Sequence, residues 1–483
     1  MNLNLREMAV PIIGVLLIAV ALVIPNTMIA YGISLVLAIA ALFRPKQAIL
    51  FLLIYFPLRS FLIELSPGLK LVGDLIIVFT FLRVLWDARK DWKSIFRFEL
   101  FEWAFIAFIL MGTVSAFLSG VVLTAIIFQI RAFVIMFLLL YIVKRLDITK
   151  RDIMNFLAVT LFVTVVLIIQ GIVEKLSARS LLMPDQWVNR QLSKNNASRI
   201  YGLVNNPNVF AVYLTISGIL IYYLKTLLPK SKLQWLLNIV LVVLAGTWIL
   251  TYSRGTWIAF IIGIVIYFLF TRNWKFVLKA GLVAALGFAL ITVPVTKAAQ
   301  WISSNTEIGE IVRTGAPEPN ETFAIETTRI KETFQSDTFE KSKTTGRLFI
   351  VYKGFEIFKD YPVIGTGFGT FGDSASKVYS SPYYSQYDIR FNIYSDNQYI
   401  QVITQNGVVG VLLFAVFLLG MLVVFWKRRK QSDKAIPMLA LLISVYWCGF
   451  IYNIWEDKTF TMYFYILTAV FLAYTSKKNT RLQ

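Results

Sequence analysis

The stretch IMNFLAVTLFVTVVLIIQGIVE, residues 153–174, decides the fold class of this chain. Its only ionisable side chain is Glu174, at the last position. About twenty helical residues, each rising 1.5 Å, cross the roughly 30 Å hydrocarbon layer of a bilayer. Similar apolar runs recur from one end of the chain to the other, without the strict alternation of a membrane β-barrel. The sequence therefore predicts an all-α polytopic membrane protein.

The composition of the 483-residue chain agrees with a membrane location. The chain is 58% hydrophobic and 15% charged, whereas about a quarter of the residues of a soluble protein are charged. The net charge of +20 does not indicate a nucleic-acid partner here, because the basic residues lie mainly in short loops on one side of the predicted membrane. The absence of histidine excludes a histidine-dependent triad and a histidine-ligated metal. We predict neither a metal nor a cofactor.

The apolar runs predict about fourteen transmembrane helices, with twelve as the alternative count. They lie at residues 8–24, 27–43, 47–65, 70–86, 100–118, 121–143, 153–174, 203–224, 234–251, 254–270, 275–295, 397–426, 436–452 and 459–475. Lysine and arginine gather in every second loop, and the short loops between hold almost none. Because basic loops stay on the cytoplasmic side, both termini are predicted to be cytoplasmic.

Two long segments, 175–202 and 296–396, are predicted on the outer side. The chain then divides into 1–295 with eleven helices, an outer loop domain 296–396, and 397–483 with three helices and a cytoplasmic tail. Helically spaced apolar residues predict an amphipathic helix at 346–360. This helix would lie on the outer leaflet or across the bundle mouth, or else pack on the rest of the loop. The Glu-, Thr- and Pro-rich part 308–344 is predicted to be mobile.

Two arginines stand in polar motifs on the predicted outer side. Arg199 opens a motif that ends in Asn208 at the start of a helix, and Arg254 lies in the turn Tyr-Ser-Arg-Gly between two helices. Guanidinium groups are suited to anionic phosphate groups. The alternatives are a capped helix start for the first motif and a snorkelling interfacial arginine for the second.

Two further motifs follow the long loop. Arg347 precedes a glycine run containing Gly365 and Gly367, whose backbone N–H groups could cradle an anion. Asp396 and Asn397 stand where a helix enters the membrane again, and Asp396 could accept a proton from a sugar hydroxyl. The alternative for Asp396 is that it merely caps this helix.

Arg131 is different, because it lies about ten residues inside a predicted transmembrane helix, two residues after Gln129. An arginine at that depth is costly and usually faces a cavity or a partner. We therefore count Arg131 as a candidate substrate-binding residue.

The order of these motifs resembles that of the O-antigen ligase and polymerase (Wzy-like) superfamily, which includes teichuronic acid polymerases. The matching stretches cover roughly the second half of the chain. They are 199–208, 253–255, 346–369 and 396–410. The resemblance implies a metal-independent, inverting, GT-C-like glycosyltransferase in the bacterial cytoplasmic membrane, with an extracytoplasmic active site. Its donor would be a glycan on undecaprenyl diphosphate and its acceptor a second glycan.

The resemblance also implies roles for single residues. Arg199 and Arg254 fall where family arginines hold the diphosphate, and Arg347 falls on the loop arginine. Asp396 stands where the family commonly has the histidine that activates the acceptor, and Gln405 replaces a glutamate. Asp396, Arg254 and Arg199 are thus the catalytic candidates. The substrate-binding candidates are Arg347, Asn208, Asn397, Arg131, Gly365 and Gly367.

Three functions remain open from the sequence. The first is a polymerase of lipid-linked repeat units for cell-wall or surface polysaccharide, such as teichuronic acid, working with a chain-length regulator or other assembly proteins. The second is a ligase that attaches finished glycan to an acceptor. The third is a lipid-linked oligosaccharide flippase or other transporter, which would spread polar groups through the depth of the bundle.

Overall fold

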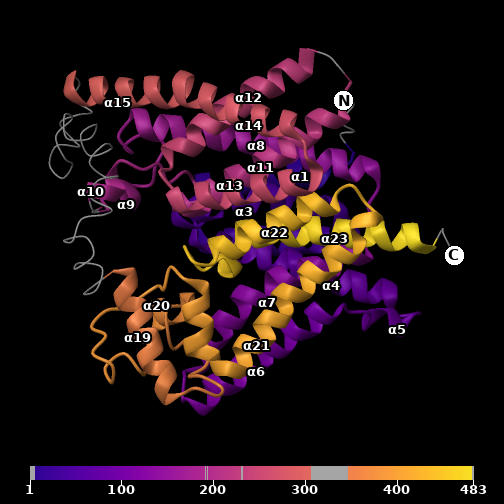
Figure 1. The fold of residues 1–483 in the computed structure, drawn as a ribbon, viewed down its shortest axis with the longest axis vertical. Helices are drawn as coiled ribbons and strands as arrows, with labels where there is room; N and C mark the ends of the chain where they lie inside the picture. The colour runs from indigo at the N-terminus through magenta and orange to yellow at the C-terminus, as the bar shows by residue number, and fades with distance from the viewer. Residues whose placement is uncertain (1–5, 191, 193, 230–231, 306–345, 481–483) are drawn as a thin grey trace. The chain divides into compact units, whose positions relative to one another are not determined.

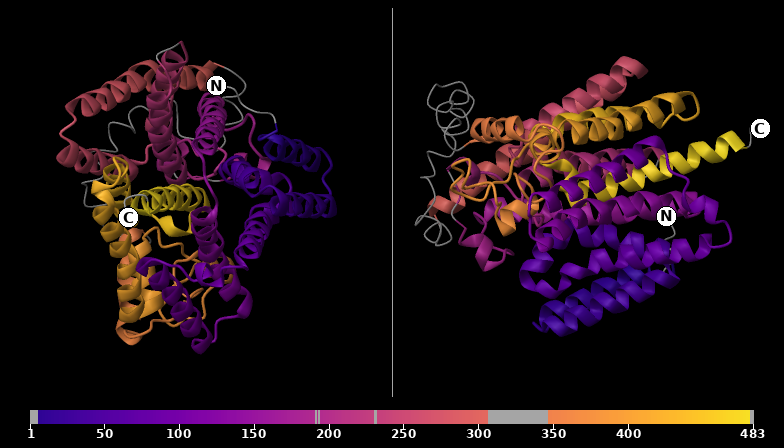
Figure 2. Two further views of the ribbon diagram at one scale, coloured as in Figure 1. Left: turned by 90° about the vertical axis from the view of Figure 1, so that its right-hand side faces the viewer. Right: turned by 90° about the horizontal axis from the view of Figure 1, so that it is seen from below.

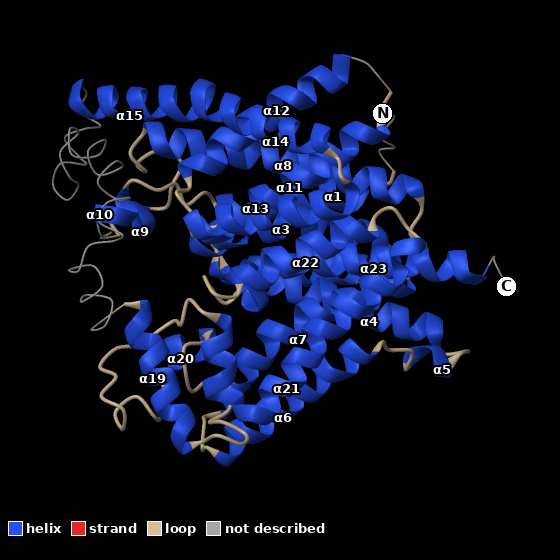
Figure 3. Ribbon diagram, in the orientation of Figure 1, coloured by secondary structure: helices blue, strands red, loops and turns tan. Residues whose placement is uncertain are grey.

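The computed structural model describes residues 6–190, 192, 194–229, 232–305 and 346–480. Every regular element in these ranges is a helix (Figure 3), which confirms the all-α fold class. Ten of these helices are long and apolar enough to cross a membrane, and three further apolar helices are shorter. The total number of spans and the side of the termini stay predictions. The predicted mobile part, 308–344, lies outside the described residues.

The chain divides into two compact units. The first comprises Met1–Trp86, Arg145–Thr256 and Asn273–Ile330, and the second comprises Asp87–Lys144, Trp257–Arg272 and Lys331–Gln483. Each unit is therefore built from segments that are far apart in the sequence. The predicted division at 295 and 396 remains a prediction about topology.

The first unit holds the N-terminal helices and a central group. Its elements are α1 (Ala9–Val23), α2 (Thr27–Phe43), α3 (Pro45–Leu65), η1 (Pro67–Leu71), α4 (Val72–Ala88, which reaches the unit boundary), α8 (Lys150–Leu176), α9 (Asp185–Val188), α10 (Lys194–Ala197), α11 (Pro207–Leu227), α12 (Lys232–Leu250), α14 (Trp274–Gly287), η2 (Phe288–Thr292) and α15 (Val293–Asn305). Within this unit, α9 and α10 lie together at one end (Figure 1).

Neighbouring helices of the first unit are joined by polar bonds as well as by apolar packing. The ammonium of Lys46 lies 2.8 Å from the Asp152 carboxylate and joins α3 to α8. The hydroxyl of Tyr213 on α11 lies 3.0 Å from that of Thr164 on α8. Such bonds hold helices together where apolar packing alone gives little preference between partners in a lipid environment.

The second unit combines transmembrane helices with the folded part of the long loop. Its elements are α5 (Trp92–Ile95), α6 (Leu100–Leu118), α7 (Leu123–Arg145), α13 (Arg254–Thr271, whose first turn belongs to the first unit), α19 (Arg347–Asp360), α20 (Ser374–Tyr379), α21 (Gln398–Lys427), η3 (Arg428–Lys430), α22 (Ala435–Cys448), η4 (Ile454–Glu456) and α23 (Lys458–Thr480). Within this unit, α19 and α20 lie together at one end, and α23 extends toward the opposite end (Figure 1).

A cluster of aromatic rings forms the centre of the second unit, where α6 and α21 lie side by side (Figure 2). The ring of Phe105 on α6 lies 4.5 Å from that of Phe417 on α21 and 4.7 Å from that of Phe137 on α7. Aromatic side chains bury a large apolar area, and such ring pairs add to the gain from burial. The cluster therefore holds α6, α7 and α21 together.

Polar caps explain several helix boundaries. The side chain of Asn206 accepts bonds from Asn208 N and Val209 N, so α11 begins at Pro207 rather than at the predicted residue 203. The helix predicted to end at 452 ends at Cys448. The loop after it is bonded to distant segments, since Asn453 Nδ2 donates to Gly372 O at 2.9 Å and Trp455 N donates to Gln398 Oε1 at 3.1 Å. The helix predicted to end at 295 continues to Asn305 after a π-helical turn.

The predicted amphipathic helix is present as α19. Its buried residues Ile350 and Ile357 join an apolar cluster with Phe371, Tyr384 and Ile400. The helix thus packs on the rest of the loop and on α21, which was the second of the two predicted arrangements. Its first residue, Arg347, lies on the exposed part of the surface.

Candidate active site

Arg199 is bound to the turn that contains Ser253 in the first unit. Its Nε donates to the carbonyl of Thr251 at 2.9 Å, and its Nη2 donates to Asn208 Oδ1 at 2.9 Å. Ser253 Oγ donates to the same Asn208 oxygen at 2.8 Å. The structure therefore brings together two motifs that are about fifty residues apart, with Asn208 as the shared acceptor.

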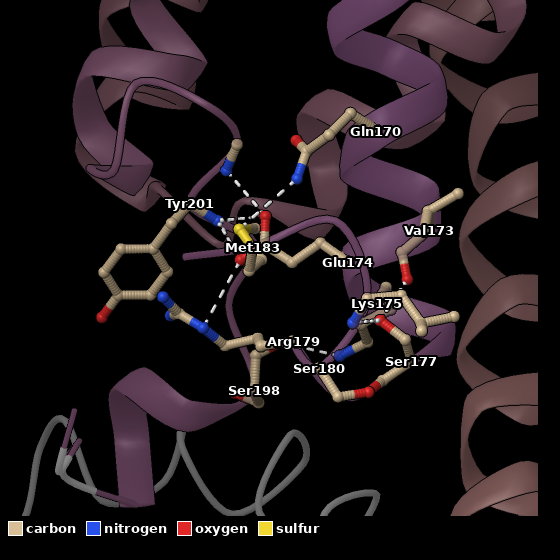
Figure 4. Close-up of polar contacts among 12 residues, drawn as sticks. Gln170, Val173, Glu174, Lys175, Ser177, Arg179, Ser180, Met183, Ser198 and Tyr201 are labelled. Carbon is tan, nitrogen blue, oxygen red and sulfur yellow. Dashed lines mark hydrogen bonds and ion pairs between the residues drawn. The ribbon is translucent and has the colours of Figure 1, made fainter. Parts of the chain in front are cut away.

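The backbone next to Arg199 is held by a buried carboxylate at the end of α8. Glu174, which is 1% exposed, accepts from Tyr201 N at 3.0 and 3.1 Å and from Gly202 N at 2.7 Å. Figure 4 shows this carboxylate beside the Tyr201 backbone. Because a carboxylate bound to backbone donors makes strong hydrogen bonds, it fixes the segment that carries Arg199. The sequence analysis did not identify Glu174 as a candidate, although it is the one charge of the quoted apolar run.

Arg254 is the first residue of α13 and is exposed. It follows Ser253, whose hydroxyl lies 2.9 Å from that of Thr256 and fixes the start of the helix. A helix N-terminus favours negative charge, so an exposed arginine at this place adds to an electropositive surface. The alternative for Arg254, a snorkelling arginine, has the residue at the same place in the helix. In that case the guanidinium binds at the membrane interface and not to a substrate phosphate.

In the second unit, Arg347 and the turn before α21 reach the same loop, residues 449–457. Arg347 Nη2 donates to the Ile451 carbonyl at 3.1 Å. Ser395 Oγ donates to Asn453 Oδ1 at 2.8 Å. This loop therefore links the arginine candidate to the segment that carries Asp396.

Asp396 does not cap α21, so the alternative considered for it is wrong. The cap is Asn397, whose Oδ1 accepts from Tyr399 N at 3.0 Å and Ile400 N at 3.1 Å. Asp396 is half-buried and has a left-handed backbone with φ of 46°. A non-glycine residue in this conformation is strained, and such residues concentrate at functional sites.

A buried acidic network underlies this turn and was missed in the sequence. The carboxylate of Glu456 accepts from Gln129 Nε2 at 2.9 Å, from Gln401 Nε2 at 2.6 Å and from Ser374 N at 3.1 Å. Burial, followed by the charge of Asp373, raises the pKa of Glu456 to about 7. Burial likewise raises the pKa of Asp373. The network joins α7, α21, α20 and η4, which are widely separated in the sequence.

The glycine run does not form the predicted anion cradle. Its N–H groups bond to protein acceptors instead, since Gly367 N donates to Gln405 O at 2.6 Å and Gly369 N to Asp373 Oδ2 at 2.7 Å. A Cβ atom would meet the Gln405 backbone at 2.3 Å from Gly365 and the Ala116 backbone at 2.0 Å from Gly367. These two glycines are needed for close backbone packing, and we leave them out of the proposed site.

Arg131 lies on α7, half-buried, two residues after the Gln129 that binds Glu456. It thus belongs to the helix that supports the acidic network. Its role in substrate binding stays a prediction.

Comparison with known proteins gives one family match. Residues 239–415 match the model of a family described as O-antigen ligase. The matched range includes the 251–256 turn, α19, the glycine run and the turn at Asp396. A search of curated proteins gave no match. The family match supports the predicted superfamily, whose members are membrane-embedded and transfer lipid-linked glycans as ligases or polymerases.

Proposed function

Because residues 239–415 match a family described as O-antigen ligase, we propose that the chain is an extracytoplasmic glycosyltransferase that polymerises lipid-linked repeat units. The donor is a glycan on undecaprenyl diphosphate, and the polymer is a cell-surface polysaccharide such as teichuronic acid. The enzyme works in the bacterial cytoplasmic membrane without a metal, and a chain-length regulator or other assembly proteins are its expected partners.

One observation carries the proposal. Arg199 lies outside the range that matches the family, yet its guanidinium is fastened to the matched turn through Thr251 and Asn208. Arg199 and Arg254 therefore stand at adjoining segments of the first unit. Paired guanidinium groups suit a diphosphate leaving group, because each can form charge-assisted bonds to phosphate oxygens.

The proposed reaction inverts the sugar carbon. The bond between this carbon and the diphosphate breaks, and the lipid diphosphate leaves with the electron pair. An acceptor hydroxyl forms the new glycosidic bond, and its proton passes to the carboxylate of Asp396. In this proposal, Arg199, Arg254 and Arg347 stabilise the diphosphate charge, and Asn208 and Asn397 hold their neighbours in place. Preorganised charges of this kind stabilise a transition state by several kcal/mol.

The test measures polymer length on the lipid carrier in cells that lack the native chain and express a variant. Arg254→Ala is expected to slow elongation by about 100-fold or more, since it removes one preorganised positive charge. Arg190→Ala, which removes an exposed arginine of the 175–206 segment, serves as the control. Long polymer in the Arg254→Ala cells at wild-type abundance would refute the diphosphate role. Asp396→Asn then tests the base separately from the arginines.

A ligase is the second candidate, and the description of the matching family favours it. Bond chemistry is the same in both cases, so only the product separates them. Purified enzyme supplied with lipid-linked repeat units alone lengthens the glycan if it is a polymerase. A ligase forms a glycosidic bond only when a separate acceptor is added. A flippase forms no new glycosidic bond, with or without that acceptor.

A further inference from the structure

We propose that the guanidinium of Arg179 binds a phosphate group beside the Arg199 segment. The proposal rests on the proposed function for the source of the phosphate, which is the diphosphate of the lipid-linked donor. Nothing in the sequence motifs singles out this arginine, since it lies in the turn after α8 and outside the range that matches the family.

The first observation is that Arg179 is buried with two donor groups unmatched. The residue is 8% exposed, and neither Nη1 nor Nη2 has a hydrogen-bond acceptor within the ranges that the structure describes. Each of these nitrogens carries two N–H donors that point away from water. Leaving buried donors of a charged group unpaired is costly, so an acceptor is expected at this place.

The second observation is that the guanidinium is held in one orientation. Its Nε lies 3.7 Å from Glu174 Oε1, and its central carbon lies 4.1 Å from the centre of the Tyr201 ring. Figure 4 shows the guanidinium beside this ring. Glu174 does not act as an acceptor for the Nη groups, since neither of them has a hydrogen-bond partner within the described ranges. The two Glu174 oxygens accept from Tyr201 N and Gly202 N.

The third observation is the strained backbone that places the side chain. Three non-glycine residues in this turn are left-handed, with φ of 48° at Ala178, 70° at Arg179 and 57° at Leu182. Such strain persists only where the surroundings enforce it, and it gathers at ligand clamps and active sites. Here it turns the chain back, so that Arg179 lies against the segment that carries Arg199.

Charge and chemistry identify the ligand class. The segment 175–206 contains five basic residues and one acidic residue, so it is electropositive apart from Glu174. A planar guanidinium with both Nη groups available matches two oxygens of one phosphate in a bidentate arrangement. Arg199 is on the same segment as Tyr201, so a diphosphate is the lipid headgroup that suits both arginines.

The test measures binding to the full chain in lipid nanodiscs, with undecaprenyl diphosphate and inorganic pyrophosphate as separate probes. Arg179→Gln is expected to weaken binding of the lipid by about 10- to 100-fold, which is the usual effect of losing hydrogen bonds to a charged group. Arg179→Lys, which keeps the charge, should lose less. Arg190→Gln, the matched control on the same segment, should bind within about twofold of wild type.

The outcomes separate the possibilities. Weaker binding of both probes supports the site, and weakening of pyrophosphate alone shows a phosphate site that the lipid does not use. Unchanged binding by folded Arg179→Gln overturns the proposal. If that variant does not fold, a structure of wild type with undecaprenyl diphosphate decides: phosphate oxygen at the Nη groups supports the site, and ordered water there refutes it. The binding test does not depend on enzyme activity. If the lipid binds through Arg179 but no polymer forms, the proposed function is refuted and the phosphate site is not.

Discussion

Single residues in this protein owe their importance to partners far away in the chain. Glu456 and Gln129 are 327 residues apart and meet at 2.9 Å, and Glu174 holds the backbone of Tyr201. In each case a buried carboxylate is the acceptor for several donors on a loop or a neighbouring helix. A buried charge is costly unless hydrogen bonds offset its desolvation, so these two carboxylates and their donors hold the surrounding loops in place.

Glu456 gives a prediction about pH. Its pKa rises from 4.5 to about 7 on folding, so between these values the folded chain binds more protons than the unfolded chain. The stability from this group is present below about pH 4.5 and is lost as the pH rises through about 7. The midpoint of thermal unfolding should therefore fall between about pH 5 and about pH 8, and Glu456→Gln should reduce this fall.

The control for this prediction is Asp388→Asn, which changes an exposed carboxylate of the same unit. It should leave the pH dependence of the unfolding midpoint as in wild type. An equal dependence in Glu456→Gln and wild type would show that Glu456 does not contribute to the fall.

At the scale of elements, the long helix α21 is interrupted at Gly407, and the loop before the helix forms backbone hydrogen bonds at this interruption. Gly407 has φ of 57° and ψ of −163° inside this helix. The interruption lets Val408 N donate to Pro362 O at 2.8 Å and Val409 N donate to Val363 O at 3.1 Å. The segment just before the glycine run is thus joined to α21 by backbone bonds, which a regular helix would not allow.

Gly407→Ala is expected to destabilise the protein by roughly 1–3 kcal/mol, because it strains a left-handed position. The added Cβ would also lie 2.5 Å from the Val363 carbonyl oxygen. The midpoint of thermal unfolding in detergent measures the effect. Gly281→Ala is the matched control, since its Cβ would meet nothing within 4 Å in a helix, and alanine there should be neutral or stabilising. Equal midpoints for the two variants would contradict the strained role of Gly407.

At the scale of the whole molecule, the alternation of basic loops predicts which segments face the cell interior. This can be tested because the single cysteine, Cys448, is buried. In a Cys448→Ala background, we expect Gln186→Cys to react with a membrane-impermeant maleimide in intact cells. Lys90→Cys should react only after the membrane is opened. Both positions are exposed, so burial does not explain a difference. Labelling of Lys90→Cys in intact cells would reverse the predicted orientation.

The sequence by itself determined where the helices form. Apolar runs that match the thickness of a bilayer predicted about fourteen helices, and the described part of the structure has a helix at each of those places, with ends displaced by at most about ten residues. How many of these helices cross the membrane stays a prediction. The same holds for α19, predicted at 346–360 and found at Arg347–Asp360. These are local properties, because helix formation depends on neighbouring residues and on the contrast between lipid and water.

Only the tertiary structure decided which polar residues share a partner. It joined Arg199 to the 251–256 turn, replaced Asp396 by Asn397 as the cap of α21, and bound the glycine run to the backbones of α6 and α21. It also showed Glu174, Glu456 and Arg179 as buried charges. The hydrogen-bond partner of a buried polar side chain comes from a segment tens to hundreds of residues away. The residues next to it in the sequence therefore do not reveal which partner it has.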